Sequence, residues 1–147
     1  AIAEGSTLVE RALRLKQPGP YQIQAAIAAV HAQATQPDVT DWPQIAALYD
    51  VLLRMQPAPV VALNRAVAHA MADGPLRGLA LLRDPDLAAA LADYHLYHAA
   101  RADLLRRAGQ PAEAHAAYAA ALRCAPNTVE RVFLERRLRE MAQEMAE

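Results

Sequence analysis

Residues 45–57 read Ile-Ala-Ala-Leu-Tyr-Asp-Val-Leu-Leu-Arg-Met-Gln-Pro, and residues 114–126 repeat that pattern as Ala-His-Ala-Ala-Tyr-Ala-Ala-Ala-Leu-Arg-Cys-Ala-Pro. The second stretch starts 69 residues after the first. At this offset five pairs of identical residues align: Ala47 with Ala116, Tyr49 with Tyr118, Leu53 with Leu122, Arg54 with Arg123, and Pro57 with Pro126. The chain therefore contains an internal repeat, and its apolar residues have helical spacing.

Half of this offset, about 34 or 35 residues, is the period of the tetratricopeptide repeat (TPR), a helix pair that completes its apolar face by stacking on the next pair. The unit at about 95–128 resembles that pattern best, with Gly109 at the turn and then Ala114, Tyr118, Ala121 and Pro126. The resemblance implies an all-α fold, a TPR-like right-handed superhelix of antiparallel helix pairs with about seven to nine helices.

Composition supports the helical prediction. The chain has 147 residues, of which 54% are hydrophobic and only 5% aromatic. Alanine alone accounts for 36 residues. Alanine favours helices, and the β-branched and aromatic residues that strands prefer are scarce, so an all-β fold is excluded.

The chain is predicted to be a single TPR-like domain over 1–147. We expect a capping helix at 2–17, repeat units at about 22–57, 60–94 and 95–128, and a C-terminal helix at 128–146. Helix starts are marked by possible capping boxes, Asp41 with Gln44 and Asn127 with Glu130, and by Pro75 and Pro111, which fit the first helical turn. Gly74 and Gly109 are expected at turns.

The C-terminal helix carries an apolar stripe, formed by Leu134, Leu138, Met141 and Met145. Two readings fit such a stripe, a capping helix or a dimerising coiled coil. We favour the capping helix, because the stripe spans barely two heptads and sustained coiled coils need about three or four.

Charge and cysteine content restrict the function classes. With 15 basic and 16 acidic residues the net charge is −1, so these residues are not expected to bind nucleic acid by themselves. No apolar run reaches the ~20 residues that span a bilayer, and no export signal is evident. The lone Cys124 fits a reducing cytoplasm. Because the chain begins at Ala1 without Met, we expect an excised piece of a longer protein or a processed product.

No motif for catalysis, a cofactor or a metal stands out, so the chain is not expected to be an enzyme. Ser6 is the sole serine, and no glycine-rich phosphate loop is present. His95 and His98 have helical spacing, with Asp93 and Asp103 nearby, but a histidine pair is a weak zinc signal and an aromatic patch at Tyr94–His98 is favoured. The remaining histidines, His31, His69 and His115, are interpreted as isolated packing residues.

A TPR groove usually binds peptides or protein segments. Its floor is predicted to comprise Val61, Asn64, Ala68, Met71, Leu96, Ala99, Asp103 and Arg106. The carboxylate clamp known from this fold needs Lys and Asn, whereas the single lysine here, Lys16, lies outside the groove. The mixed surface suits a helix or a neighbouring domain better than an anionic tail.

Several stretches together resemble one specific family. They are Pro18–Ile27, Asp41-Trp42, Ile45–Asp50, Val61–Ala68, Asp73-Gly74-Pro75, Gly78–Leu82, Tyr94-His95, Ala99–Arg106 and Glu130–Leu138. In this order they resemble the TPR-like C-terminal extension of bacterial extracytoplasmic-function (ECF) type RNA polymerase sigma factors. The resemblance covers essentially the whole chain.

This resemblance implies that the intact protein recruits core RNA polymerase to promoters. Its sigma regions precede the extension and would make the promoter DNA contacts. This chain would regulate those sigma regions by docking on them or on a protein partner. No contact with a membrane is expected. The residues expected in the interaction groove or its turns are Asn64, Arg65, Met71, Asp73, Gly74, His95, Arg101, Asp103 and Arg106.

Two alternatives remain open from the sequence. One is a generic TPR protein-binding module of another bacterial protein, and the other is a small-molecule sensor that uses the helical groove. The residues encoded before Ala1 would separate the first alternative from the sigma-factor interpretation. Thermal stabilisation by a ligand would indicate the second.

Overall fold

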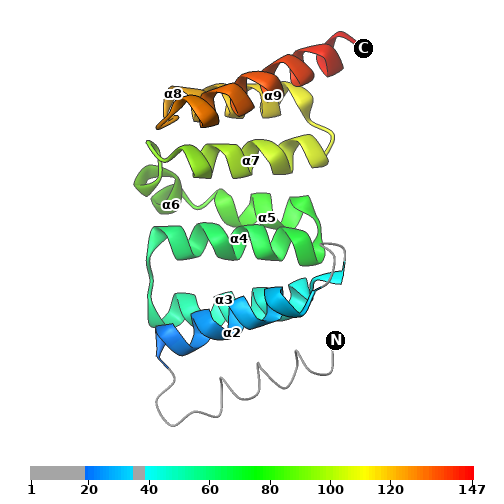
Figure 1. Ribbon diagram of the computed structural model, residues 1–147. Coiled ribbons are helices and arrows are strands. Elements are labelled where there is room, and N and C mark those ends of the chain that lie inside the picture. The colour runs from blue at the N-terminus through cyan, green and yellow to red at the C-terminus, as the bar shows by residue number, and fades with distance from the viewer. Residues whose placement is uncertain (1–18, 35–38) are drawn as a thin grey trace. The chain divides into compact units, whose positions relative to one another are not determined.

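The computed structural model describes residues 19–34 and 39–147, and within these ranges all regular structure is helical (Figure 1). The helices are α2 (Pro20–Gln33), α3 (Trp42–Met55), α4 (Pro59–Asp73), α5 (Pro75–Leu82), α6 (Pro85–Ala90), α7 (His95–Arg107), α8 (Pro111–Arg123) and α9 (Thr128–Ala146). The predicted all-α class is confirmed. The expected capping helix at 2–17 lies outside the described residues.

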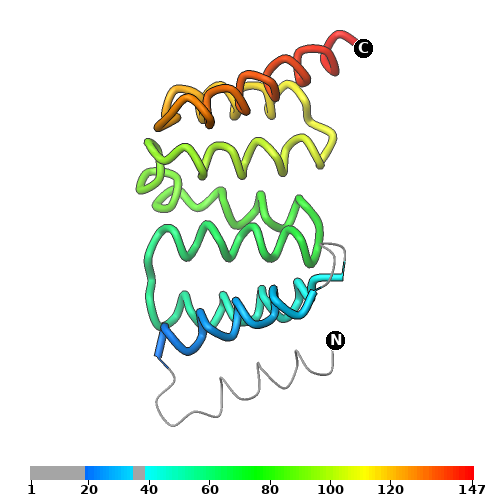
Figure 2. The backbone as a smooth tube through the Cα atoms, viewed as in Figure 1, coloured from blue at the N-terminus to red at the C-terminus, as the bar shows by residue number. Residues whose placement is uncertain are grey.

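The chain divides into two compact units, Ala1–Asp73 and Gly74–Glu147. In the first unit α3 packs against both α2 and α4. In the second unit α8 packs against both α7 and α9, and α5 contacts α7. Figure 2 shows the backbone reversing direction between α7 and α8 and again between α8 and α9.

The helix starts follow the sequence signals. The carboxylate of Asp41 accepts a hydrogen bond from the Gln44 backbone N–H at 3.3 Å, and the Asn127 side chain accepts one from the Glu130 N–H at 2.9 Å. These bonds satisfy backbone donors that have no partner within the helix. A capping box at Asp41 would also have the Gln44 side chain accept a hydrogen bond from the Asp41 backbone N–H. Instead, the Gln44 side chain donates a hydrogen bond to the carboxylate of Asp41.

The first helical turns and the connecting glycines also agree with prediction. Pro75 and Pro111 occupy the first turn of α5 and α8, where a missing N–H costs nothing. Gly74 has a φ of 103° and Gly109 a φ of 76°. Only glycine adopts such values readily, so both turns depend on this residue type.

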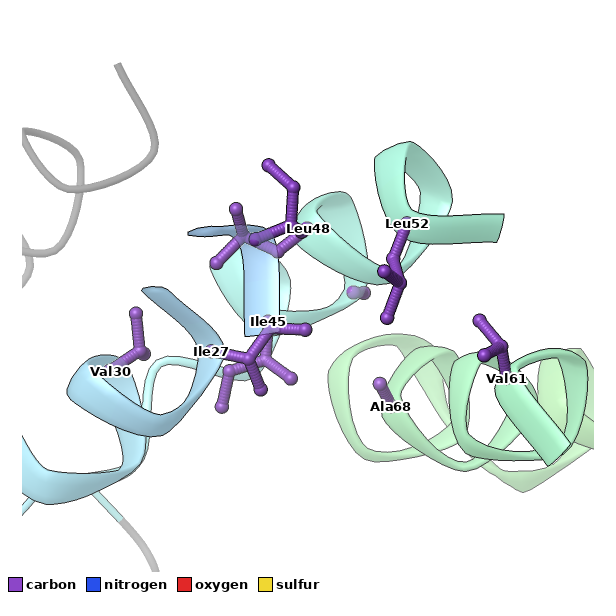
Figure 3. Close-up of a cluster of buried hydrophobic side chains, with 9 residues drawn as sticks. Ile27, Val30, Ile45, Leu48, Leu52, Val61 and Ala68 are labelled. Atoms are coloured by element: carbon purple, nitrogen blue, oxygen red, sulfur yellow. The ribbon is translucent and has the colours of Figure 1, made fainter. Parts of the chain in front are cut away.

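The core of the first unit is built from three helices (Figure 3). Its buried members are Ile23, Ile27 and Val30 of α2, Ile45, Ala46, Leu48 and Leu52 of α3, and Val61 and Ala68 of α4. The prediction that Val61 and Ala68 line a groove is wrong, because they are only 8% and 1% exposed. They lie two helical turns apart on the stripe of α4 that packs on α3, and Figure 3 shows Leu52 of α3 directed toward that helix.

The core of the second unit relies on small residues of α8. Ala114 and Ala121 are fully buried, and Tyr118 between them is nearly so. These alanines allow the neighbouring backbones to approach, and the tyrosine ring fills the remaining space. From α9, Leu134 and Met141 are buried, whereas the far end of the predicted stripe, at Met145, is exposed.

Candidate functional site

A polar cluster lies between α3 and α4 in the first unit. Asp50 of α3 faces Arg65 and His69, which lie one helical turn apart on α4. Asp50 Oδ1 accepts a hydrogen bond from Arg65 Nε at 2.6 Å, and His69 Nε2 lies 2.8 Å from the same oxygen. His69 Nδ1 also lies 3.8 Å from a carboxylate oxygen of Asp73, one turn further along α4. We call these four residues the Asp50 cluster.

The Asp50 cluster is only partly shielded from solvent. The side chain of His69 is 13% exposed, that of Arg65 28% and that of Asp50 34%. Such exposure weakens the ion pairs relative to buried ones, and exposed pairs contribute little to stability. The cluster therefore orients its side chains more than it stabilises the fold.

The charge on Asp50 is maintained by its neighbours. Burial by itself would raise the pKa of Asp50, but hydrogen bonds and positive charge from Arg65 and His69 outweigh burial. The pKa consequently lies below its ordinary value. Because an ionised carboxylate only accepts hydrogen bonds, His69 carries a proton on Nε2 in this contact.

A cleft of about 320 Å³ opens beside the Asp50 cluster, lined by Asp50, Leu53 and Arg54 of α3 and by Arg65 of α4. Arg54 is exposed. In the described part of the chain no hydrogen bond or ion pair engages its guanidinium. The cleft thus combines two guanidinium groups, that of Arg65, which is paired with the Asp50 carboxylate, and that of Arg54, which has no carboxylate partner among the described residues.

A second polar group lies on α7 in the second unit. Asp103 is 2.6 Å from Arg106 Nη2 and 3.1 Å from Arg107 Nε. Hydrogen bonding to Asp103 and then to Tyr118 raises the pKa of Arg106 further above its ordinary value. Arg106 Nε is buried without a hydrogen-bond partner. The group forms an internal charge network of α7 and α8.

The nine predicted interaction residues are divided between the two units. Arg65 and Asp73 belong to the Asp50 cluster, and Asp103 and Arg106 to the network on α7. Asn64 and Met71 are exposed on α4, and Gly74 lies at its turn. His95 lies edge-on to Tyr94 at 5.7 Å, and Arg101 is half-buried near Tyr97.

Sequence reasoning missed Asp50 and Arg54, and its interpretation of His69 as an isolated packing residue is wrong. His69 lies between two carboxylates. The available signal was the spacing of Arg65, His69 and Asp73, which repeats every four residues and so places all three on one side of a helix. Asp50 could not be paired with them without knowing how α3 and α4 pack.

The histidines at the start of α7 serve local packing. His98 Nε2 lies 2.6 Å from the carbonyl oxygen of Ala92, and its ring stacks edge-on with that of Tyr97 at 5.2 Å. Tyr97 is buried and donates its hydroxyl to the Leu82 carbonyl at 3.1 Å. Among the described residues, no three His, Cys, Asp or Glu side chains converge as a metal site would require.

Comparison with known proteins places the chain beside one longer relative. It is 43% identical over 145 residues to an uncharacterized protein of Rhizobium meliloti (strain 1021). The match covers 99% of this chain and 34% of that protein, so the chain spans about a third of the relative's length. No family model matches the chain, and no solved structure matches it. In the described residues no helix has both the length and the apolar character needed to cross a membrane.

Proposed function

We propose that this chain is a TPR-like regulatory domain of an ECF-type RNA polymerase sigma factor. In this proposal the helix pairs form a right-handed superhelix, and the domain modulates the sigma regions by intra- or intermolecular contact. The intact protein would act in the cytoplasm with core RNA polymerase and would reach promoter DNA through its other domains. The domain itself would perform no catalysis and need no cofactor.

The observation that carries the proposal is the alignment of nearly all of this chain with only a third of a longer protein. That ratio fits a domain that works attached to other domains. The family resemblance described above supplies the identity of those domains, and the stretches that carry it include the α3–α4 helix pair and the glycine turn at residue 74.

Regulation of this kind needs only different contacts with two states of the sigma regions. A ligand or domain shifts an equilibrium by its difference in affinity for the two states, and a few kcal/mol changes occupancy strongly. Half-exposed charged groups such as the Asp50 cluster suit this role, because they add specificity without irreversible association.

Deletion of residues 1–147 from the intact protein tests the proposal. Transcription from the protein's own promoter should change severalfold at unchanged protein level. The direction of the change would distinguish an activating from an inhibiting domain. Equal output from the deleted and intact proteins, at equal abundance, would refute the regulatory function.

A point variant separates domain contacts from general effects of truncation. Arg65→Gln removes a charge from the Asp50 cluster, and Arg123→Gln removes one at an exposed helix end in the second unit. Under the proposal the first change alters transcription more than the second. The generic TPR module predicts no effect on transcription from either variant.

A further inference from the structure

The cleft beside the Asp50 cluster has an excess of positive charge. Arg54 and Arg65 bring two guanidinium groups to its walls, and Asp50 brings one carboxylate. The charge on that carboxylate is already engaged by Arg65 and His69 through the same oxygen. A ligand entering the cleft therefore meets a net positive site.

The guanidinium of Arg65 is held in a fixed orientation. Its Nε donates to Asp50, which leaves the outer edge with the two η nitrogens. Within the described ranges no other hydrogen bond engages this guanidinium. Two parallel N–H groups at that edge match the two oxygens of a carboxylate, and such bidentate pairs are among the strongest charge-assisted hydrogen bonds.

The remaining walls define the size and character of the ligand. Leu53 gives the cleft an apolar side, and its volume of about 320 Å³ lies at the small end of the usual range for small-molecule pockets. Arg54 is exposed and stands as a second cation at the same cleft. A short carbon chain that ends in a carboxylate fits these features.

Packing alone does not explain the polar residues. At the 69-residue offset, the positions of Asp50, Arg65 and His69 correspond to Ala119, Leu134 and Leu138 in the second unit. There the α8–α9 pair packs with apolar side chains in their place. An ion-pair cluster replaced by apolar residues is often no less stable, so the helix pair does not need these charges to pack.

We propose that the cleft between α3 and α4 binds a carboxylate, which Arg65 holds end-on through its η nitrogens while Arg54 adds a second positive charge to the site. The carboxylate comes from a free dicarboxylate or from an acidic side chain of a protein segment. The assignment depends on the cleft alone and holds whether or not the domain regulates sigma regions.

Nuclear magnetic resonance titration of the ¹⁵N-labelled 147-residue chain with succinate, at constant ionic strength, tests the site. Saturable shifts should appear at Leu53, at Arg54 and at the side-chain Nε–H of Arg65. Arg65→Gln should weaken binding at least about tenfold, because a hydrogen-bonded charged group contributes roughly 1.5–3 kcal/mol. Arg54→Gln should have a smaller effect.

Two further variants test the geometry. Arg65→Lys keeps the charge but loses the bidentate edge, so it should also bind severalfold more weakly. Arg123→Gln is the matched control, since Arg123 is the exposed counterpart of Arg54 at the 69-residue offset and is not among the residues that line this cleft. It should bind succinate like the native chain.

Two other probes identify the class and source of the ligand. A blocked pentapeptide with a central glutamate that binds tighter than succinate indicates an acidic side chain, and the reverse order indicates a free dicarboxylate. Tighter binding of inorganic phosphate than of either probe would overturn the carboxylate assignment. So would shifts that do not saturate, equal weakening by Arg123→Gln, or full affinity in Arg65→Lys. Because the titration contains no sigma region, its failure is distinct from failure of the transcription test.

Discussion

The α3–α4 pair of the first unit and the α8–α9 pair of the second have the same register but different interiors. Helix α8 starts 69 residues after α3, and α9 starts 69 residues after α4. Three matching positions are buried in the first helix of both pairs, Ile45, Leu48 and Leu52 in α3 and Ala114, Ala117 and Ala121 in α8. One helical register thus accommodates large side chains in one unit and alanine in the other.

The two helix pairs also differ in polarity, because three polar positions of the first pair are apolar in the second. Asp50, Arg65 and His69 occupy positions that hold Ala119, Leu134 and Leu138 in the second unit. The comparison teaches that burial at fixed helical positions determines this packing, whereas the charges are an addition specific to the first unit. Substitutions at the buried apolar positions and at the charged positions test whether burial or charge determines the packing.

The largest effect is expected at Leu134, which is nearly fully buried in the second unit. Leu134→Ala should lower the free energy of unfolding by about 2 to 5 kcal/mol, because it removes buried apolar surface and leaves a cavity. Urea denaturation followed by circular dichroism measures the change. Val132→Ala, on an exposed part of the same helix, is the control and should change stability by less than about 0.5 kcal/mol. Equal losses would show that α9 is not anchored by Leu134.

An intermediate effect is expected from enlarging the alanines of α8. Ala121→Leu introduces the residue found at the matching Leu52, but at a fully buried position between closely packed helices. Overpacking of this kind costs about 1 to 3 kcal/mol. The control is Ala116→Leu on the exposed side of α8, which should leave the urea midpoint nearly unchanged. A stable Ala121→Leu variant would mean that the alanines do not set the helix spacing.

Much of the helical framework could be predicted from sequence because its signals are local. Pro75, Pro111 and the cap at Asn127 act within one helical turn of their own positions, and the structure places all three as expected. Alanine-rich segments between such signals have few alternatives to the helix. The expected burial of Leu134 and Met141 followed from their spacing on one helix.

The candidate site could not be predicted in the same way because it depends on how two helices pack. Asp50 and His69 are 19 residues apart in sequence, and no local pattern links them. The groove prediction failed at Val61 and Ala68 for a related reason, since the face of α4 that packs on α3 could not be distinguished from a face left open. Periodicity identifies an apolar face but not the partner that covers it.

A smaller effect is expected when the first unit is given the apolar character of the second. Asp50→Ala leaves Arg65 and His69 without their shared acceptor and should cost about 1 to 2 kcal/mol, reduced by the partial exposure of the cluster. Adding Arg65→Leu should restore most of this loss, because the unpaired charge is also removed. Urea denaturation of the two single variants and the double variant measures the coupling. Additive losses would contradict the view that the charges are dispensable for packing.

The smallest effect is the dependence of stability on pH. The pKa of Asp50 is lowered in the folded chain, so its charged form stabilises the fold at pH values above about 4, the ordinary pKa of an aspartate. That contribution is lost as the pH falls from about 4 through the lower pKa of the folded state. Asp50→Asn removes this titration. The stability difference between the native chain and Asp50→Asn should therefore shrink as the pH falls below about 4, as measured by urea denaturation. A difference that stays constant down to pH 3 would show that Arg65 and His69 do not hold Asp50 in its charged form, and the α3–α4 pair would then differ from α8–α9 in composition but not in electrostatics.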